Sequence, residues 1–147
     1  MSYDPNPYYC MFMNTVNAPF AIAIPVANTF YPMAGGLSDG GGNGITFQNA
    51  SELRIDTPGT YLVAWALALD SKNGQFVEVT ILKNGVSQSS VIGAIETAVA
   101  NNTYCTSGNG VLKLVVGDVV KIGVMNYSGP NPLNIWSVSL TLRKIAP

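Results

Sequence analysis

The 147-residue sequence contains no histidine, few charged residues and no long apolar run. The absence of histidine excludes Ser-His-Asp and Cys-His catalysis and removes the commonest zinc ligand. The eight carboxylates form no recognisable acid–base pair, and the glycine-rich residues 40–44 lack the Lys-Ser/Thr pair of a phosphate-binding loop. Asp39 with Asn43, or Asp70 with Asn73, could bind calcium, but neither pair has the ligand density of a known calcium loop. The sequence therefore predicts a protein that is not an enzyme and holds no cofactor or metal.

Charged residues make up only 10% of the chain, where about 25% is usual. The net charge is −1, and the seven basic residues are scattered singly apart from Arg143-Lys144. This pattern gives no electrostatic footprint for nucleic acid. Because a small domain with so few charges tends to associate, we expect partners to cover part of its surface.

The longest apolar run is nine residues, 61–69, which is too short to span a bilayer. The first 14 residues lack a basic region followed by an apolar core, so no secretory signal is visible. A role outside the cell would therefore need release by lysis, delivery by assembly, or a signal already removed.

The two cysteines, Cys10 and Cys105, do not have the spacing of metal ligands. Two free thiols are one interpretation. A disulfide, within one chain or between neighbouring copies, is the other.

Residues 1–17 contain two prolines and are predicted to form an extended N-terminal docking arm, followed by one folded domain over residues 18–147. The arm carries an aromatic run that is suited to docking against a neighbouring protein. Its candidate docking residues are Tyr8, Tyr9, Cys10 and Phe12.

Eight to ten short strands, separated by turn residues, are expected along the chain. Asn84-Gly85 is the strongest hairpin signal, because a type I′ turn needs positive φ at both central residues. Residues 35–44, with six glycines, are predicted to be a loop. No stretch shows a sustained helical period, so the fold class is all-β, an antiparallel sandwich or jelly roll.

Residues 59–69 form the most unusual predicted strand, because both of its faces are apolar. One face carries bulky side chains: Tyr61, Val63, Trp65, Leu67 and Leu69. The other carries smaller ones: Leu62, Ala64, Ala66 and Ala68. Both faces are therefore expected to be covered.

Three motifs resemble the tumour necrosis factor/complement C1q superfamily of trimeric jelly rolls. Gly59-Thr-Tyr-Leu-Val-Ala-Trp65 resembles its G-x-Y-x-F-x-[FY] signature, with Val63 and Trp65 in place of aromatic residues. Residues 109–122 resemble its penultimate hairpin, and residues 139–145 its closing strand. The resemblance covers about residues 20–145, and the short Gly-Ala-rich spacing is more similar to bacterial relatives found in spore exosporium filaments and in phage knobs and fibres.

The resemblance implies a homotrimer in which the bulky face of the unusual strand fills the sandwich and the small face packs near the three-fold axis. The trimer-interface residues expected on this basis are Leu62, Ala64, Ala66, Ala68, Ile135, Ser137 and Ser139. An extra layer of the same chain over that face is the alternative.

The expected function is that of a non-enzymatic structural subunit at the external surface of a spore or phage particle (virion), docked through its N-terminal arm to other proteins of the assembly. The alternative is a receptor- or glycan-binding adhesion knob that uses surface loops over residues 35–44, 96–107 and 128–132.

Overall fold

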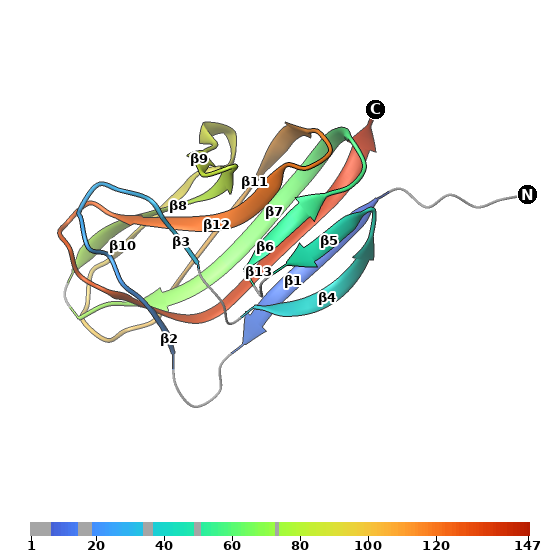
Figure 1. Cartoon of the computed structure of the whole chain (residues 1–147). Helices are drawn as coiled ribbons and strands as arrows, with labels where there is room; N and C mark the ends of the chain where they lie inside the picture. Colours follow the sequence, from blue (N-terminus) through green and yellow to red (C-terminus); the bar gives the residue numbers. More distant parts are fainter. Residues whose placement is uncertain (1–6, 15–18, 34–36, 49–50, 73) are drawn as a thin grey trace, which may run out of the picture.

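Two antiparallel β-sheets face each other and enclose the hydrophobic core in the computed structural model (Figure 1). The structure describes residues 7–14, 19–33, 37–48, 51–72 and 74–147. The predicted all-β antiparallel jelly roll is confirmed. Its described part has thirteen strands rather than eight to ten, because several strands of two to four residues add to the long ones.

The first sheet has six strands, and long strands form its centre. Its spatial order is β11 (Tyr104–Leu114), β7 (Gly59–Asp70), β13 (Leu133–Ala146), β1 (Tyr8–Asn14) and β4 (Ser38–Asn43), with β2 (Phe20–Ile22) paired to β13. β1 begins and β13 ends at the same end of the sandwich (Figure 1).

The second sheet has seven strands. Its order is β10 (Gly93–Thr97), β8 (Gln75–Lys83), β12 (Val119–Asn126), β6 (Glu52–Ile55) and β5 (Ile45–Gln48), with β3 (Tyr31–Pro32) paired to β12 and β9 (Val86–Ser87) paired to β8. The 3₁₀ turn η1 (Ser89–Val91) joins β9 to β10.

Strand β7 supplies the centre of the core. Its bulky face points inward, and Tyr61, Val63 and Trp65 are at most 2% exposed. Burying each such side chain contributes about 1.5–3 kcal/mol to folding. The Trp65 indole N–H donates to the Val91 carbonyl at 2.8 Å, so its polar atom is satisfied inside the core.

Two turns contact each other at one end of the second sheet: the β8–β9 hairpin turn and the turn between β11 and β12. Because β11 and β12 lie in different sheets and do not pair, the hairpin expected over residues 109–122 is instead a connection between the two sheets. Asn84 (φ 51°) and Gly85 (φ 82°) have the positive φ angles of the predicted type I′ turn. The Asn84 amide donates to Asp118 at 2.8 Å, and the Asn84 side-chain oxygen accepts from the Val119 N–H at 2.9 Å. Asp118 also accepts from the Val115 N–H at 2.9 Å and so stabilises the turn that contains Gly117.

Residues 8–14 form strand β1, which pairs with β13 on one side and β4 on the other. The prediction of a docking arm outside the fold is therefore wrong for this segment, and residues 1–6 and 15–17 lie outside the described residues. Tyr8 is exposed, whereas Tyr9 is buried and stacks on Phe47 with ring centroids 6.4 Å apart. This alternation is that of a strand. The prolines that precede this segment favour an extended arm over a strand in the sequence.

Strand β4 corrects the prediction of a loop over residues 35–44. A Cβ atom at Gly42 would lie 2.2 Å from the Tyr8 carbonyl oxygen, and one at Gly40 would lie 2.4 Å from the Cys10 Sγ. Glycine at these positions lets β4 approach β1 closely. The Tyr9 hydroxyl donates to Asp39, which fastens the two strands together.

A β-bulge in β13 changes the face of one predicted interface residue. The register shifts between Ile135 and Ser137, so Trp136 is the extra residue. Ile135 lies opposite Leu69, is fully buried and belongs to the core. Its assignment to a trimer interface is wrong, because strict alternation does not continue through the bulge. The Trp136 indole N–H donates to the Asp70 carboxylate at 2.5 Å and holds this geometry.

Candidate assembly interface

The outer side of the six-stranded sheet carries a continuous field of small side chains. Directly paired residues of neighbouring strands point to the same side, so the strand register fixes its members. Ala64 on β7 pairs with Asn109 on β11 and with Thr141 on β13. Ala66 and Ala68, two and four residues further along β7, pair with residues of the same two strands. We call this field the small-residue face: Ala64, Ala66, Ala68, Cys105, Ser107, Asn109, Ser137, Ser139 and Thr141.

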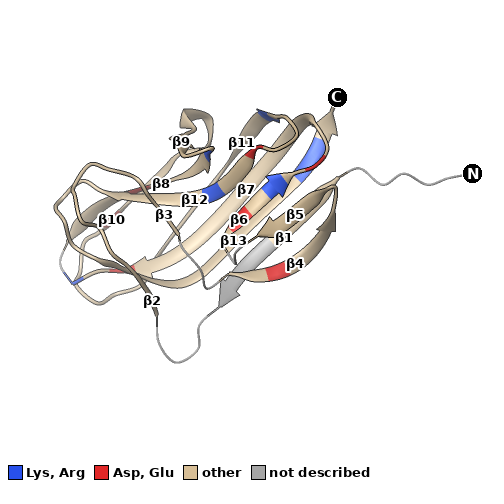
Figure 2. Cartoon of the chain, viewed as in Figure 1, with Lys and Arg blue, Asp and Glu red and all other residues tan. Residues whose placement is uncertain are grey.

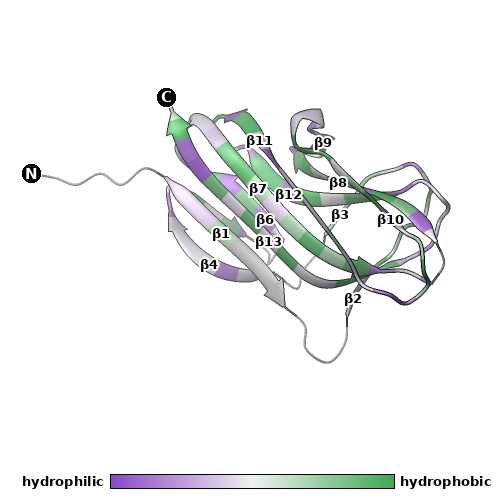
Figure 3. Ribbon diagram, turned by 180° about the vertical axis from the view of Figure 1, so that it is seen from behind, coloured by the Kyte–Doolittle hydropathy of each residue, from purple (hydrophilic) through white to green (hydrophobic). Residues whose placement is uncertain are grey.

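The small-residue face is accessible in the single chain. Ala64 and Ala66 are exposed, and Ala68 is half-buried, although their neighbours Val63, Trp65 and Leu67 are buried. None of the described residues forms a further layer over Ala64 and Ala66, so the expected alternative of an intramolecular cover is not found there. Figure 3 shows β7 and β13 side by side, each with greener and paler stretches along its length.

Six of the seven predicted interface residues lie on this side of the sheet. Leu62 borders the small-residue face, opposite Val111 and Arg143. The other five are Ala64, Ala66, Ala68, Ser137 and Ser139. Sequence reasoning missed the contribution of β11, whose exposed positions alternate with half-buried ones from Tyr104 to Gly110. The role of these residues in a trimer stays a prediction.

Charge is confined to one border of the face. Arg143 lies opposite Leu62, and Lys113 lies opposite Thr60, both at the end where β13 ends. β7 carries no charge along its length before Asp70, and the basic residues of β13 lie near the C-terminus (Figure 2). A second protein surface could therefore cover the small-residue face without burying an unpaired charge.

Both cysteines are free. Cys10 on β1 pairs with Thr141 of β13, which in turn pairs with Ala64 of β7. Cys105 on β11 pairs with Ala68 of β7. Three strand spacings and four residues along the sheet separate them by about 20 Å. Because a disulfide needs Cα atoms within about 7 Å, a bond within one chain is excluded. A bond between copies stays a prediction.

Several carboxylates are fixed by hydrogen bonds to neutral groups. Asp39 accepts from the Tyr9 hydroxyl and the Gly41 N–H, and these bonds hold its pKa below the usual value. Burial and the Asp39 contact raise the pKa of Tyr9. Asp70 accepts from Asn134 at 2.8 Å and from Trp136. These contacts give Asp39 and Asp70 structural roles. The described residues contain no group of three or more His, Cys, Asp or Glu side chains that could hold a metal.

Three loops meet at the end of the sandwich where β7 ends. Gln75 connects them: its N–H donates to Thr97, and its side-chain oxygen accepts from Asn126 at 2.9 Å and from Asn131 at 3.1 Å. The Asn101 N–H donates to the Ser71 carbonyl at 2.9 Å. This largely buried polar network fixes the loops that follow β7, β10 and β12 relative to one another.

The two-sheet antiparallel sandwich has the jelly-roll fold of C1q and tumour necrosis factor domains. Among solved structures, the globular domain of zebrafish complement 1qA protein is similar over 95% of this chain and 97% of its own, with 16% identity and a TM-score of 0.59. The Eiger TNF of S. frugiperda is similar over 95% and 94%, with 12% identity and a TM-score of 0.63. Murine APRIL is similar over 94% and 99%, with 12% identity and a TM-score of 0.61.

At these identities the likeness establishes the shared fold. No protein-family model matches the sequence, and no curated protein matches it significantly. In the part of the chain that the structure describes, no helix is long and apolar enough to cross a membrane.

Proposed function

We propose that this protein is a non-enzymatic structural subunit whose jelly-roll domain forms a homotrimer through the small-residue face. The observation that carries the proposal is the exposure of an uncharged face of small side chains at the centre of the six-stranded sheet. Small side chains let the backbones of neighbouring copies approach closely. The likeness to C1q and tumour necrosis factor domains supports the proposal at the level of the fold.

Native mass spectrometry of wild type and of two charge variants tests the trimer. Wild type is expected to be trimeric, and Ala64→Lys and Ala66→Glu to be monomeric, because an unpaired buried charge costs about 3–5 kcal/mol. Ala94→Lys is the matched control, since Ala94 is an exposed strand alanine on β10 of the other sheet. A monomeric wild type, or trimers in both charge variants, would overturn the proposal.

The same proposal places the trimer in an external bacterial or phage assembly, either a spore surface layer or a virion. Its support is the low charge, which favours a surface covered by other proteins, and the resemblance to spore and phage jelly rolls. Residues 1–6 precede β1 and are proposed to dock the trimer to the next component.

Deletion of residues 1–6 tests this docking, whereas deletion of residues 1–17 would also remove β1. We expect the shorter deletion to leave the trimer intact and to prevent incorporation into the native assembly, scored by immunogold electron microscopy. Normal incorporation of the deletion variant would show that another part of the chain docks.

A receptor- or glycan-binding knob is the second candidate. The loops over residues 98–103 and 127–132 are held at one end of the sandwich and expose Val99 and Tyr127. A glycan array with the trimer separates the two functions. Specific retention that is lost on shortening the 98–103 loop would favour the knob, and no retention would favour the structural subunit.

A further inference from the structure

The outer side of the seven-stranded sheet carries an exposed aromatic pair. Phe76 is on β8, and Tyr127 directly follows β12; each is 43% exposed. Their ring centroids are 5.6 Å apart, and the ring planes meet at 53°. The Tyr127 N–H donates to the Phe76 carbonyl at 2.9 Å, so the two rings stay side by side. The two rings therefore form one exposed aromatic surface on this sheet.

Two carboxylates border the aromatic pair. Glu96 on β10 lies directly opposite Phe76, and Glu78 is two residues further along β8 on the same side, where it hydrogen-bonds with the Tyr127 hydroxyl. Together these four residues form the aromatic–acidic patch: Phe76, Glu78, Glu96 and Tyr127. Among the described residues, the salt bridges are Arg54–Asp56 and Lys121–Glu52, so neither carboxylate of the patch is paired with a cation.

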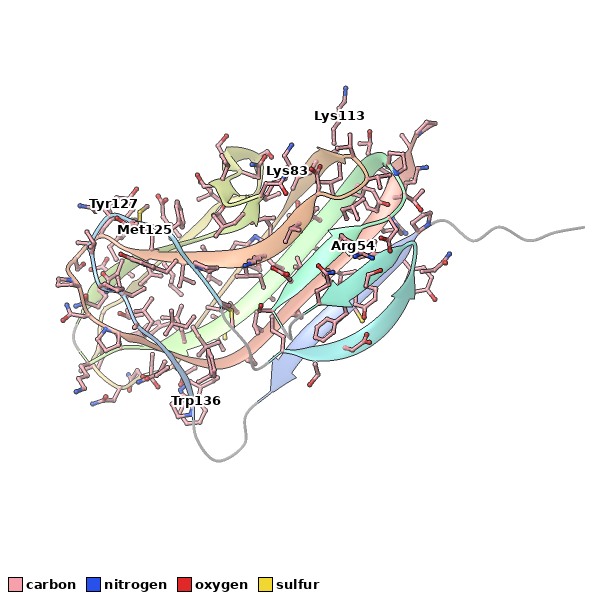
Figure 4. The ribbon with its side chains drawn as sticks, viewed as in Figure 1. Arg54, Lys83, Lys113, Met125, Tyr127 and Trp136 are labelled. Carbon is pink, nitrogen blue, oxygen red and sulfur yellow. The ribbon has the colours of Figure 1, made fainter. Side chains whose placement is uncertain are left out.

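The patch lies away from most of the basic residues. Tyr127 and Met125 are next to each other at one end of the sandwich, whereas Arg54, Lys83 and Lys113 are towards its other end (Figure 4). Lys72 is exposed in the turn before β8. The negative charge of the patch is therefore not neutralised by an ion pair within the described part of the chain.

The aromatic–acidic patch is held in place from beneath. The Phe76 N–H donates to the Ser128 hydroxyl at 2.8 Å, and the Ser128 N–H donates to the Asn126 side-chain oxygen at 2.9 Å. Asn126 is fully buried and bonded to Gln75. Binding at this patch would consequently require little ordering of its backbone.

We propose that the aromatic–acidic patch binds a lysine or arginine side chain presented by a partner protein. A cation bound on this surface would lie against an exposed ring face and pair with the neighbouring carboxylates. An apolar partner would instead desolvate both carboxylates without compensation. Charge complementarity therefore selects a basic segment. The patch is on the sheet opposite the small-residue face, so this binding is independent of the proposed trimer.

Isothermal titration of the full chain tests the proposal with three probes: an octapeptide of alternating glycine and lysine, the same peptide with glutamate in place of lysine, and a neutral maltoheptaose. The lysine peptide is expected to bind, and its affinity to fall as salt increases. The glutamate peptide and the sugar are expected not to bind. Binding of the sugar alone would overturn the proposal and assign the patch to a carbohydrate.

Variants locate the binding. Phe76→Ala and the double variant Glu78→Gln/Glu96→Gln are each expected to weaken lysine-peptide binding about fivefold or more, since one cation–π contact contributes about 1 kcal/mol. Glu52→Gln is the matched control, because it removes an acidic charge on β6 of the same sheet outside the patch. Equal weakening by Glu52→Gln, or unchanged binding to Phe76→Ala, would show that the peptide responds only to overall charge and would overturn the proposal.

Discussion

Single carboxylates of this protein act mainly as acceptors for neutral donors that join distant segments. Asp70 accepts a hydrogen bond from the indole N–H of Trp136, 66 residues away in the sequence. Asp39 accepts one from the hydroxyl of Tyr9. Asp118 links two turns, because it accepts from Val115 and from Asn84. With so few charges, the chain uses several of its acidic side chains as structural acceptors.

Replacing Asp118 should destabilise the subunit in a pH-dependent way. Burial alone would raise the pKa of Asp118, but the bonds from Val115 and Asn84 and the nearby Lys83 lower it. Because the pKa of Asp118 is lower in the folded state, its charge stabilises the fold at pH values above the unfolded-state pKa of about 3.9. This contribution is lost as the pH falls through the folded-state pKa. Asp118→Ala is expected to cost about 1–3 kcal/mol at pH 7 and less at pH 3.

Urea unfolding of wild type and Asp118→Ala at pH 7, 5 and 3, at one protein concentration, measures this difference. Asp56→Ala is the control, since Asp56 is exposed and paired with Arg54 at the surface, where the effect should stay below about 1 kcal/mol. A cost for Asp118→Ala that does not change with pH would contradict the assigned role of its charge.

At the scale of elements, local patterns predicted β7 and the turn at Asn84-Gly85 well. The alternation along β7 needs no knowledge of its partners, and the positive φ angles follow from residue type. β4 has no apolar alternation to read, since its sequence Ser-Asp-Gly-Gly-Gly-Asn becomes a strand only through close contact with β1. Likewise, the bulge at Trp136 depends on Asp70 in another strand. The strand β4 and the bulge at Trp136 therefore depend on long-range contacts, which a reading of local sequence patterns does not include.

The close approach of β4 to β1 predicts that Gly42→Ala is destabilising. A Cβ atom there would lie 2.2 Å from the Tyr8 carbonyl oxygen and 2.7 Å from the Tyr9 Cα, so the backbones must separate. The expected loss is about 1–3 kcal/mol in the free energy of unfolding, measured by urea titration. Gly74→Ala serves as the control, because a Cβ atom there meets nothing closer than 3.5 Å. Equal stability of the two variants would argue against the observed β1–β4 pairing.

The bulge in β13 predicts opposite consequences for two neighbouring residues. Ile135→Ala opens a cavity in the core and should lower the free energy of unfolding by about 2–5 kcal/mol. Ser137→Ala removes only a hydroxyl on the outer side and should change it by less than about 0.5 kcal/mol. Chemical denaturation in the monomeric Ala66→Glu background separates folding from association. A loss of stability well below this range for Ile135→Ala would indicate that Ile135 lies on the outer side of the sheet and not in the core.

At the scale of the whole molecule, the two outer sheet surfaces have different chemistry. The six-stranded sheet presents an uncharged face of small side chains, whereas the seven-stranded sheet presents aromatic rings and carboxylates. The first suits close packing of identical copies, and the second suits a basic partner. A subunit built in this way could join its own copies on one side while leaving the other side free for a different component.

Cys105 reports whether the small-residue face is covered in the assembled molecule. It lies on β11, opposite Ala68 of β7, and is exposed in the single chain, so a trimer formed through this face should shield its thiol. In a Cys10→Ser background, we expect maleimide to label Cys105 at least about tenfold more slowly in the trimer than in the monomeric Ala66→Glu variant. Equal labelling rates in a confirmed trimer would mean that the copies meet elsewhere. Non-reducing electrophoresis of the wild type completes the test, because a bond between Cys10 and Cys105 of neighbouring copies would appear as covalent dimers or trimers that reducing agent dissociates.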